Sequence, residues 1–188
     1  MHVFSKIWIL KINVLDDVGG IDGYVKYLKG INQKAKGVAD TDWSDDYGGL
    51  SPEVAKKYEK TNDKMLKLFK KSLTGLTEKT ISNHLDNADF YINDYLLYRC
   101  GYSFEQGITE INEFLGYFFI RKCTWSTPGN IKTTAASIKK FYKCMMENGK
   151  IGNDDYTYLC DTIKAGMKEW QDTCAQYNDE DYDDPFEY

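Results

Sequence analysis

Apolar residues recur at three- and four-residue steps in several stretches of this chain. This spacing places the apolar side chains along one side of an α-helix, where a neighbouring element can bury them. The clearest stretch opens at Thr77 and closes at Gly101, and its apolar positions are Ile81, Leu85, Ala88, Ile92, Tyr95 and Leu96. The pattern predicts a protein built from helices.

Four further stretches begin with residues that favour a helix start. Ser51-Pro52-Glu53 opens a lysine-rich helix to about Leu73, Ser103 to Gln106 has the pattern of a capping box, and Ser126-Thr127-Pro128 opens another helix. Asn153 and Asp154 are expected to cap the last one. The predicted apolar stripes are Val54, Tyr58, Met65, Leu68 and Phe69; Ile108, Ile111, Leu115, Phe118 and Phe119; Ile131, Ala135, Ile138, Tyr142 and Met145; and Tyr156, Leu159, Ile163, Met167, Trp170 and Cys174.

Short connections between these helices favour a compact antiparallel bundle of four to five helices, so we expect an all-α fold. The predicted organisation has a partly irregular N-terminal arm over residues 1–50, since glycines and aspartates punctuate it. The lysine-rich helix follows at 51–75, the helical bundle at 76–177, and an acidic tail at 178–188.

Composition is consistent with a folded domain and points to no cofactor. Hydrophobic residues make up 42% of the 188 residues, enough to form a core without metals or disulfides. The five cysteines contain no C-x-x-C pair and only two histidines occur, so we expect reduced thiols and no metal site. No run of about 18 apolar residues is present, and no signal peptide is evident. The cytoplasm is the expected location.

The net charge of −5 conceals an uneven distribution along the chain. From Leu115 to Gly152 there are seven basic residues and a single acid, Glu147. From Asn153 onwards there are eleven acids and two lysines. A basic middle followed by an acidic end predicts surfaces that meet different partners.

Several segments between Leu76 and Trp170 form a further pattern: Thr77–Ile81, Asp89–Leu96, Ile111–Leu115, Ser126–Lys132, Ala135–Lys143 and Gly149–Ile151. The last three combine a helix start, an Ile-Lys-Lys-Phe-Tyr segment and a glycine turn. This pattern resembles the N-terminal, SAM-like core-binding domain of phage integrases and other tyrosine recombinases. The resemblance implies a helical bundle that closes on DNA.

Recombinase chemistry is not expected from this chain. In that family a second domain supplies an arginine, a His-x-x-Arg motif and a nucleophilic tyrosine. His84 is followed by Leu85, Asp86 and Asn87, so it does not begin such a motif. Elsewhere no nucleophile, base and orienting group are spaced as a catalytic set. We therefore expect a protein that is not an enzyme and has no catalytic residues.

The candidate nucleic-acid surface is a basic stripe. Lys132, Lys139 and Lys143 lie on the helix that Ser126-Thr127-Pro128 opens. They fall within about 40° of one another, away from its apolar stripe, because each helical residue turns by about 100°. Lys140 lies next to them in sequence, and Arg121 and Lys122 end the preceding helix. Phosphate contacts need such a cluster. The stripe predicts binding to duplex DNA or to a DNA-handling protein, although a solvated lysine face has the same appearance.

The acidic C-terminus supports an alternative function. Asp181, Asp183, Asp184 and Phe186 could engage a basic partner, which would make the chain an interaction or inhibitory protein that mimics DNA. The same tail could instead occupy the basic stripe, or serve only solubility.

Overall fold

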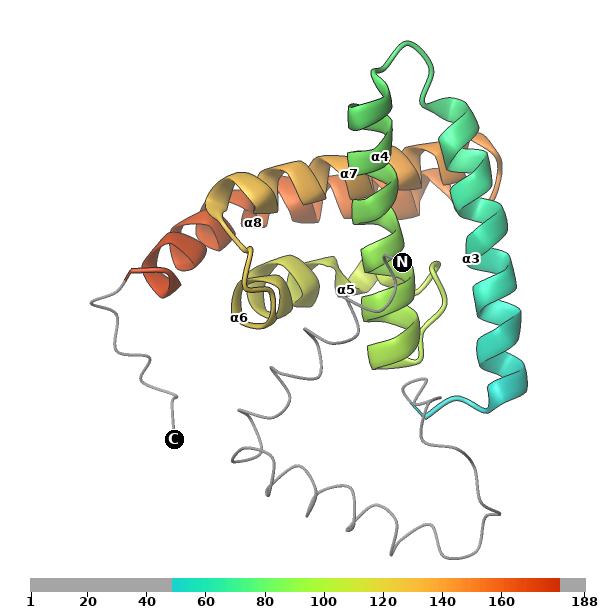
Figure 1. Ribbon diagram of the computed structural model, residues 1–188, viewed down its shortest axis with the longest axis horizontal. Helices are drawn as coiled ribbons and strands as arrows, with labels where there is room; N and C mark the ends of the chain where they lie inside the picture. Colours follow the sequence, from blue (N-terminus) through green and yellow to red (C-terminus); the bar gives the residue numbers. More distant parts are fainter. Residues whose placement is uncertain (1–48, 180–188) are drawn as a thin grey trace, which may run out of the picture. The chain divides into compact units, whose positions relative to one another are not determined.

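The computed structural model describes residues 49–179, and within that range every regular element is helical. Its helical segments join end to end into five helices that pack together, as Figure 1 shows. They are α3 (Pro52–Ser72); α4 (Glu78–Asp89), which continues into η1 (Phe90–Cys100); α5 (Gly107–Glu113), which continues into η2 (Phe114–Phe118) and α6 (Phe119–Lys122); α7 (Pro128–Glu147); and α8 (Asn153–Tyr177). The predicted all-α bundle is confirmed for the described residues.

The N-terminal signals act where the sequence predicts them. The Ser51 hydroxyl accepts a hydrogen bond from the Val54 N–H at 3.5 Å. The Thr77 hydroxyl accepts from the Thr80 N–H at 3.3 Å, and the Thr127 hydroxyl accepts from the Asn130 N–H at 3.1 Å. Each bond satisfies an N–H that the first turn of a helix leaves without a partner. Gly101 has a φ of +70° after η1, which is the left-handed conformation that ends a helix most easily at glycine.

Two local predictions, the stripe position of Val54 and the cap of the last helix, were wrong, and the capping box is confirmed only in part. Val54 is exposed, and the adjacent Ala55 is fully buried instead, because the packed side of α3 is rotated from the predicted stripe. Only half of the capping box forms: the Gln106 side chain accepts the Ser103 N–H at 3.0 Å, and α5 begins after a turn, at Gly107. The cap of α8 is Gly152, whose N–H donates to Asp155 Oδ2 at 3.1 Å.

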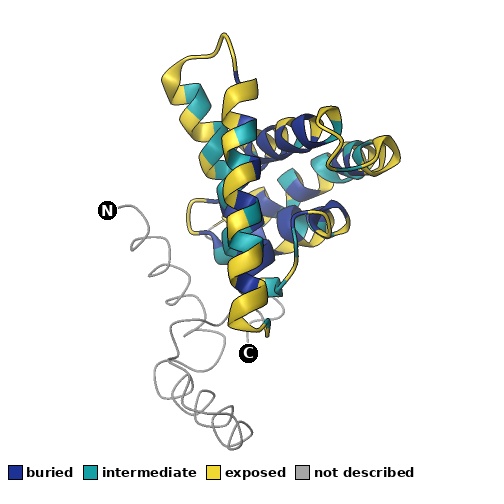
Figure 2. Cartoon of the chain, turned by 90° about the vertical axis from the view of Figure 1, so that its right-hand side faces the viewer, coloured by how far each residue is buried: buried dark blue, intermediate teal, exposed yellow. Residues whose placement is uncertain are grey.

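The helices are arranged around an antiparallel pair. α7 and α8 lie side by side, the end of α8 returns to the start of α7, and α4 crosses the pair with α3 beside it (Figure 1). The Asn178 amide donates to the Ser126 carbonyl at 2.8 Å, which fixes this return. Buried positions concentrate where the helices face one another, and exposed positions lie on their outer sides (Figure 2).

The centre of the core is aromatic and comes from the two π-helical segments, η1 and η2. The Phe114 ring lies 4.6 Å from the Tyr91 ring and 4.8 Å from the Tyr95 ring, measured between centroids. Tyr95 also contacts Phe118, at 4.9 Å. These separations match the tilted arrangements that aromatic pairs prefer. The two π-helical segments therefore pack against each other through their aromatic side chains.

Most of the predicted arm and most of the predicted tail lie outside residues 49–179. The arm over residues 1–50 lies outside the described residues except for Gly49 and Leu50, and the tail lies outside them after Asp179. No helix within residues 49–179 is long and apolar enough to cross a membrane.

Candidate functional site

Four lysines lie on the side of α7 that faces away from the core. Lys132, Lys140 and Lys143 are exposed and Lys139 is half-buried, so we call these four residues the α7 basic face. Ile131, Ala135, Ile138, Tyr142 and Met145, the predicted apolar stripe of this helix, are all buried. The structure therefore places the four α7 lysines on one helix, opposite its packed side.

Few acidic residues within the described range neutralise the positive charge of the α7 basic face. Lys143 lies 3.7 Å from Glu147 one turn later, and both side chains are more than half exposed. Such an exposed pair contributes little to stability. Lys132, Lys139 and Lys140 form no ion pair with another residue of the 49–179 range. Most of the positive charge on α7 is thus not neutralised by an ion pair with residues 49–179.

Arg121 and Lys122 are positioned differently from the α7 lysines. The Arg121 guanidinium lies over the Tyr117 ring at 5.3 Å and over the Tyr177 ring at 5.2 Å. A cation held over aromatic faces is attracted by their electron density. Arg121 therefore joins α6 to the end of α8, and both it and Lys122 are half-buried.

A polar cluster that the sequence did not reveal fixes α7 against α4. Ser137 is 1% exposed, and its Oγ lies 2.9 Å from the Thr133 carbonyl oxygen. A carbonyl can only accept, so the hydroxyl donates its single proton there. The same Oγ then accepts from Asn87 Nδ2 at 3.0 Å and from His84 Nδ1 at 2.8 Å.

The position of the Ser137 hydroxyl proton determines whether His84 can act as a base towards this serine. A nucleophilic serine must donate its proton to the histidine, and here the donation runs the other way. Burial, together with the nearby charge of Lys140, lowers the pKa of His84. The imidazole is accordingly neutral near pH 7, and its hydrogen bond to Ser137 connects α4 to α7.

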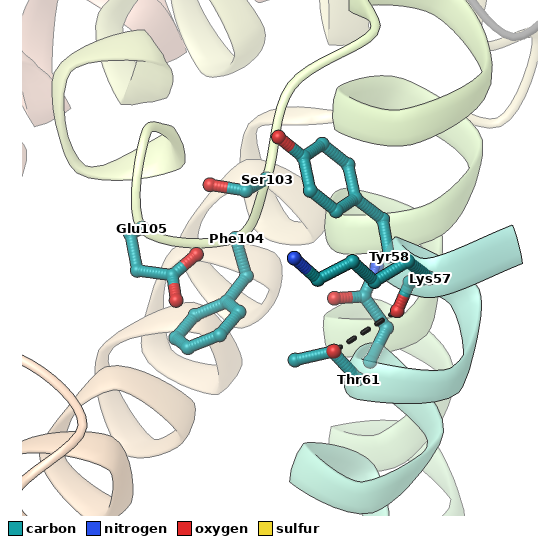
Figure 3. A pocket seen from close by; sticks show the side chains of 7 residues that line it. Lys57, Tyr58, Thr61, Ser103, Phe104 and Glu105 are labelled. Carbon is teal, nitrogen blue, oxygen red and sulfur yellow. Dashed lines mark hydrogen bonds between the residues drawn. The ribbon is translucent and has the colours of Figure 1, made fainter. Parts of the chain in front are cut away.

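A hollow of about 320 Å³ opens between α3 and the turn that precedes α5. Its walls are Lys57, Tyr58, Thr61 and Asn62 from α3 and Ser103, Phe104 and Glu105 from the turn (Figure 3). Asn62 is a buried polar residue, 1% exposed, on the packed side of α3. The sequence does not predict this burial, because the apolar spacing of a helix gives no sign of a polar residue on its packed side.

Within residues 49–179, no three histidine, cysteine or acidic side chains gather as metal ligands would. None of the five cysteines forms a disulfide. Asp181, Asp183, Asp184 and Phe186 lie outside the described residues.

Comparisons of the chain with protein-family models, with curated proteins and with solved structures gave no match. The fold class therefore rests on the structure alone.

Proposed function

We propose that the protein is a non-enzymatic helical module that binds the phosphate backbone of duplex DNA through the α7 basic face. The observation that carries this proposal is the arrangement of Lys132, Lys139, Lys140 and Lys143 on one exposed side of a rigidly packed helix, with only Lys143 paired. Lysines that form no ion pair with the described residues can displace counterions from DNA, and the released counterions drive binding.

The resemblance to the core-binding domain of tyrosine recombinases forms the second support for this proposal. The Ile138–Tyr142 segment that carries it belongs to α7, so the likeness and the lysines coincide on one element. In this proposal the bundle is of the core-binding type and uses α7 to contact DNA.

The overall acidity of the chain does not oppose the proposal. Residues 49–179 contain eighteen basic and seventeen acidic residues, so the helical body is nearly neutral. Residues 180–188 contribute five acids and no basic residue, and they account for most of the net −5. The charge that would repel DNA is therefore concentrated outside the described bundle.

A charge-reversal experiment tests the function. Lys132→Glu/Lys139→Glu/Lys143→Glu should abolish binding to a labelled DNA duplex, measured by fluorescence polarisation at about 50 mM salt, because each phosphate contact contributes roughly tenfold to affinity at that salt. The matched control is Lys60→Glu/Lys64→Glu/Lys67→Glu on α3, where all three lysines are exposed and the net charge changes equally.

The control separates a local surface from total charge. The proposal requires the α3 variant to bind appreciably better than the α7 variant. An equal loss of DNA affinity in the two variants would show that net charge, and not the α7 basic face, governs binding. A wild-type dissociation constant above about 10⁻⁴ M, the weak end of non-specific affinity, would exclude DNA as the partner.

A further inference from the structure

The hollow between α3 and the turn before α5 is lined by polar groups, some of which have no partner among the described residues. Tyr58 and Ser103 line it, and neither side-chain hydroxyl forms a hydrogen bond with another residue of the described range. Thr61 differs, since its hydroxyl donates to the Lys57 carbonyl at 3.0 Å (Figure 3). The Phe104 ring, only 2% exposed, provides an apolar surface beside these groups.

The side-chain amide of Asn62, which also lines the hollow, has a fixed orientation. Its Nδ2 donates to the Ile92 carbonyl at 3.1 Å and to Asn93 Oδ1 at 2.8 Å. Because the Ile92 carbonyl can only accept, the orientation of the amide is settled, and Oδ1 points elsewhere. That oxygen accepts no hydrogen bond from another residue of the 49–179 range. Asn62 is among the residues that line the hollow, and it is only 1% exposed.

Opposite charges face each other across the hollow without pairing. Figure 3 shows the Lys57 side chain extending from α3 towards the turn that carries Phe104 and Glu105. Neither Lys57 nor Glu105 forms an ion pair with a described residue, so their charged atoms are more than 4.0 Å apart. A ligand that carries both charges can contact both groups at once.

We propose that this hollow binds a small zwitterion of the α-amino-acid class. The ligand's ammonium group donates to the Glu105 carboxylate. Its carboxylate accepts from the Lys57 ammonium group, with the Tyr58 and Ser103 hydroxyls as further donors. The volume of about 320 Å³ lies at the lower end of small-molecule sites, which suits a ligand of this size.

Probes that differ by one charge test this site. Free α-amino acids, taken in turn, are titrated into the full-length protein, and binding is followed by calorimetry and by the amide NMR signals of residues 57–62 and 103–106. At least one amino acid should bind with a dissociation constant below about 1 mM, the weak limit of specific recognition. Its N-acetyl and carboxamide derivatives should each bind at least about tenfold more weakly, since each loses a charged hydrogen-bonding group.

Two conservative variants place the binding in the hollow. Lys57→Met and Glu105→Gln replace exposed residues, so they keep the fold, and each should raise the dissociation constant at least about tenfold. Lys60→Met, an exposed lysine of α3 outside the hollow, is the matched control and should bind as the wild type does. The proposal is overturned if no amino acid binds at about 1 mM, if the blocked probes bind equally well, or if the two variants bind unchanged.

Discussion

The Nδ1 atom of His84 lies 2.8 Å from the Oγ atom of Ser137, and this contact joins α4 to α7 across the bundle. The serine proton is already donated to the Thr133 carbonyl, so the imidazole must be the donor. The histidine that the sequence left without a role therefore helps to hold the helix that carries the α7 basic face.

We expect the stability of the protein to fall as the pH decreases below about 6.5, the ordinary pKa of histidine. Burial and the charge of Lys140 lower the pKa of His84 in the folded state. At a pH between the lowered pKa of His84 in the folded protein and its ordinary pKa in the unfolded chain, the unfolded chain binds the proton more readily. The free energy of unfolding therefore decreases with falling pH. Urea unfolding from pH 7.5 to 5.5 measures this in a His2→Gln background, which leaves His84 as the only histidine.

Two variants check the origin of this pH dependence. His84→Gln should flatten the dependence in that pH range. Lys140→Gln removes the neighbouring positive charge and should raise the pKa of His84, observed as the midpoint of an imidazole NMR titration. A wild-type midpoint at or above about 6.5 would contradict the assigned environment.

Gly166→Ala should destabilise the protein because Trp170 occupies the space that a methyl group needs. A helical side chain leans towards the preceding turn, so the Trp170 indole covers Gly166 of the same helix, while Gly116 of η2 closes on it from the facing helix. A Cβ at Gly166 would lie 2.3 Å from the ring. We expect a loss of about 1–3 kcal/mol, typical of overpacking, in urea unfolding.

Gly129→Ala provides the matched comparison for this steric effect. Gly129 is exposed in the first turn of α7, and its nearest neighbour would be Thr127 Oγ1 at 3.8 Å from the new Cβ. Alanine should be neutral there, or stabilising by up to about 1 kcal/mol through helix propensity. Equal stability of the two variants would contradict the close packing of Trp170.

Sequence patterns predicted the helices because caps and apolar spacing are local properties. Thr77 and Thr127 cap where expected, and the stripe around Ile138 is buried, since each depends on neighbours a few residues away. The π-helical turns and the Asn62 and His84 contacts were missed. Asn62 bonds a carbonyl thirty residues away, and His84 reaches a serine fifty-three residues away. Such pairs depend on how helices pack, which spacing within one helix does not reveal.

Cys123 should resist alkylation in the folded protein. Burial, with a smaller effect from the charge of Asp94, raises the pKa of its thiol to about 12, so almost no reactive thiolate forms at pH 8. Cys100 and Cys160 are half-buried and should be modified first by a maleimide, followed by peptide mass spectrometry. Denaturant should make all five equivalent, and fast labelling of Cys123 without denaturant would contradict its burial.

The salt dependence of DNA binding should report the number of lysines in contact. With three to six phosphate contacts, the logarithm of the binding constant should fall against the logarithm of salt concentration with a slope of about −3 to −5. Lys139→Gln should make the slope less steep by about 0.9, since one contact is lost. Polarisation titrations between 50 and 200 mM salt measure both values, and an unchanged slope would remove Lys139 from the interface.

Removal of residues 180–188 should strengthen DNA binding. The deleted segment holds five acids and no basic residue, so its loss removes a charge that repels phosphate. Truncation after Asp179 keeps Asn178, whose amide donates to the Ser126 carbonyl and joins α8 to the start of α7. The measurement is a polarisation titration of both proteins with the same duplex at about 50 and 200 mM salt.

The salt series distinguishes two ways in which the tail could act. A long-range repulsion is screened within a Debye length, about 10 Å at 0.1 M salt, so the gain in affinity should shrink as salt increases. A full-length variant with Glu180, Asp181, Asp183, Asp184 and Glu187 changed to their amides should then bind as the truncated protein does. If truncation leaves DNA affinity unchanged but abolishes capture of a basic protein partner, the acidic tail is itself the binding element, and the alternative function is favoured over DNA binding.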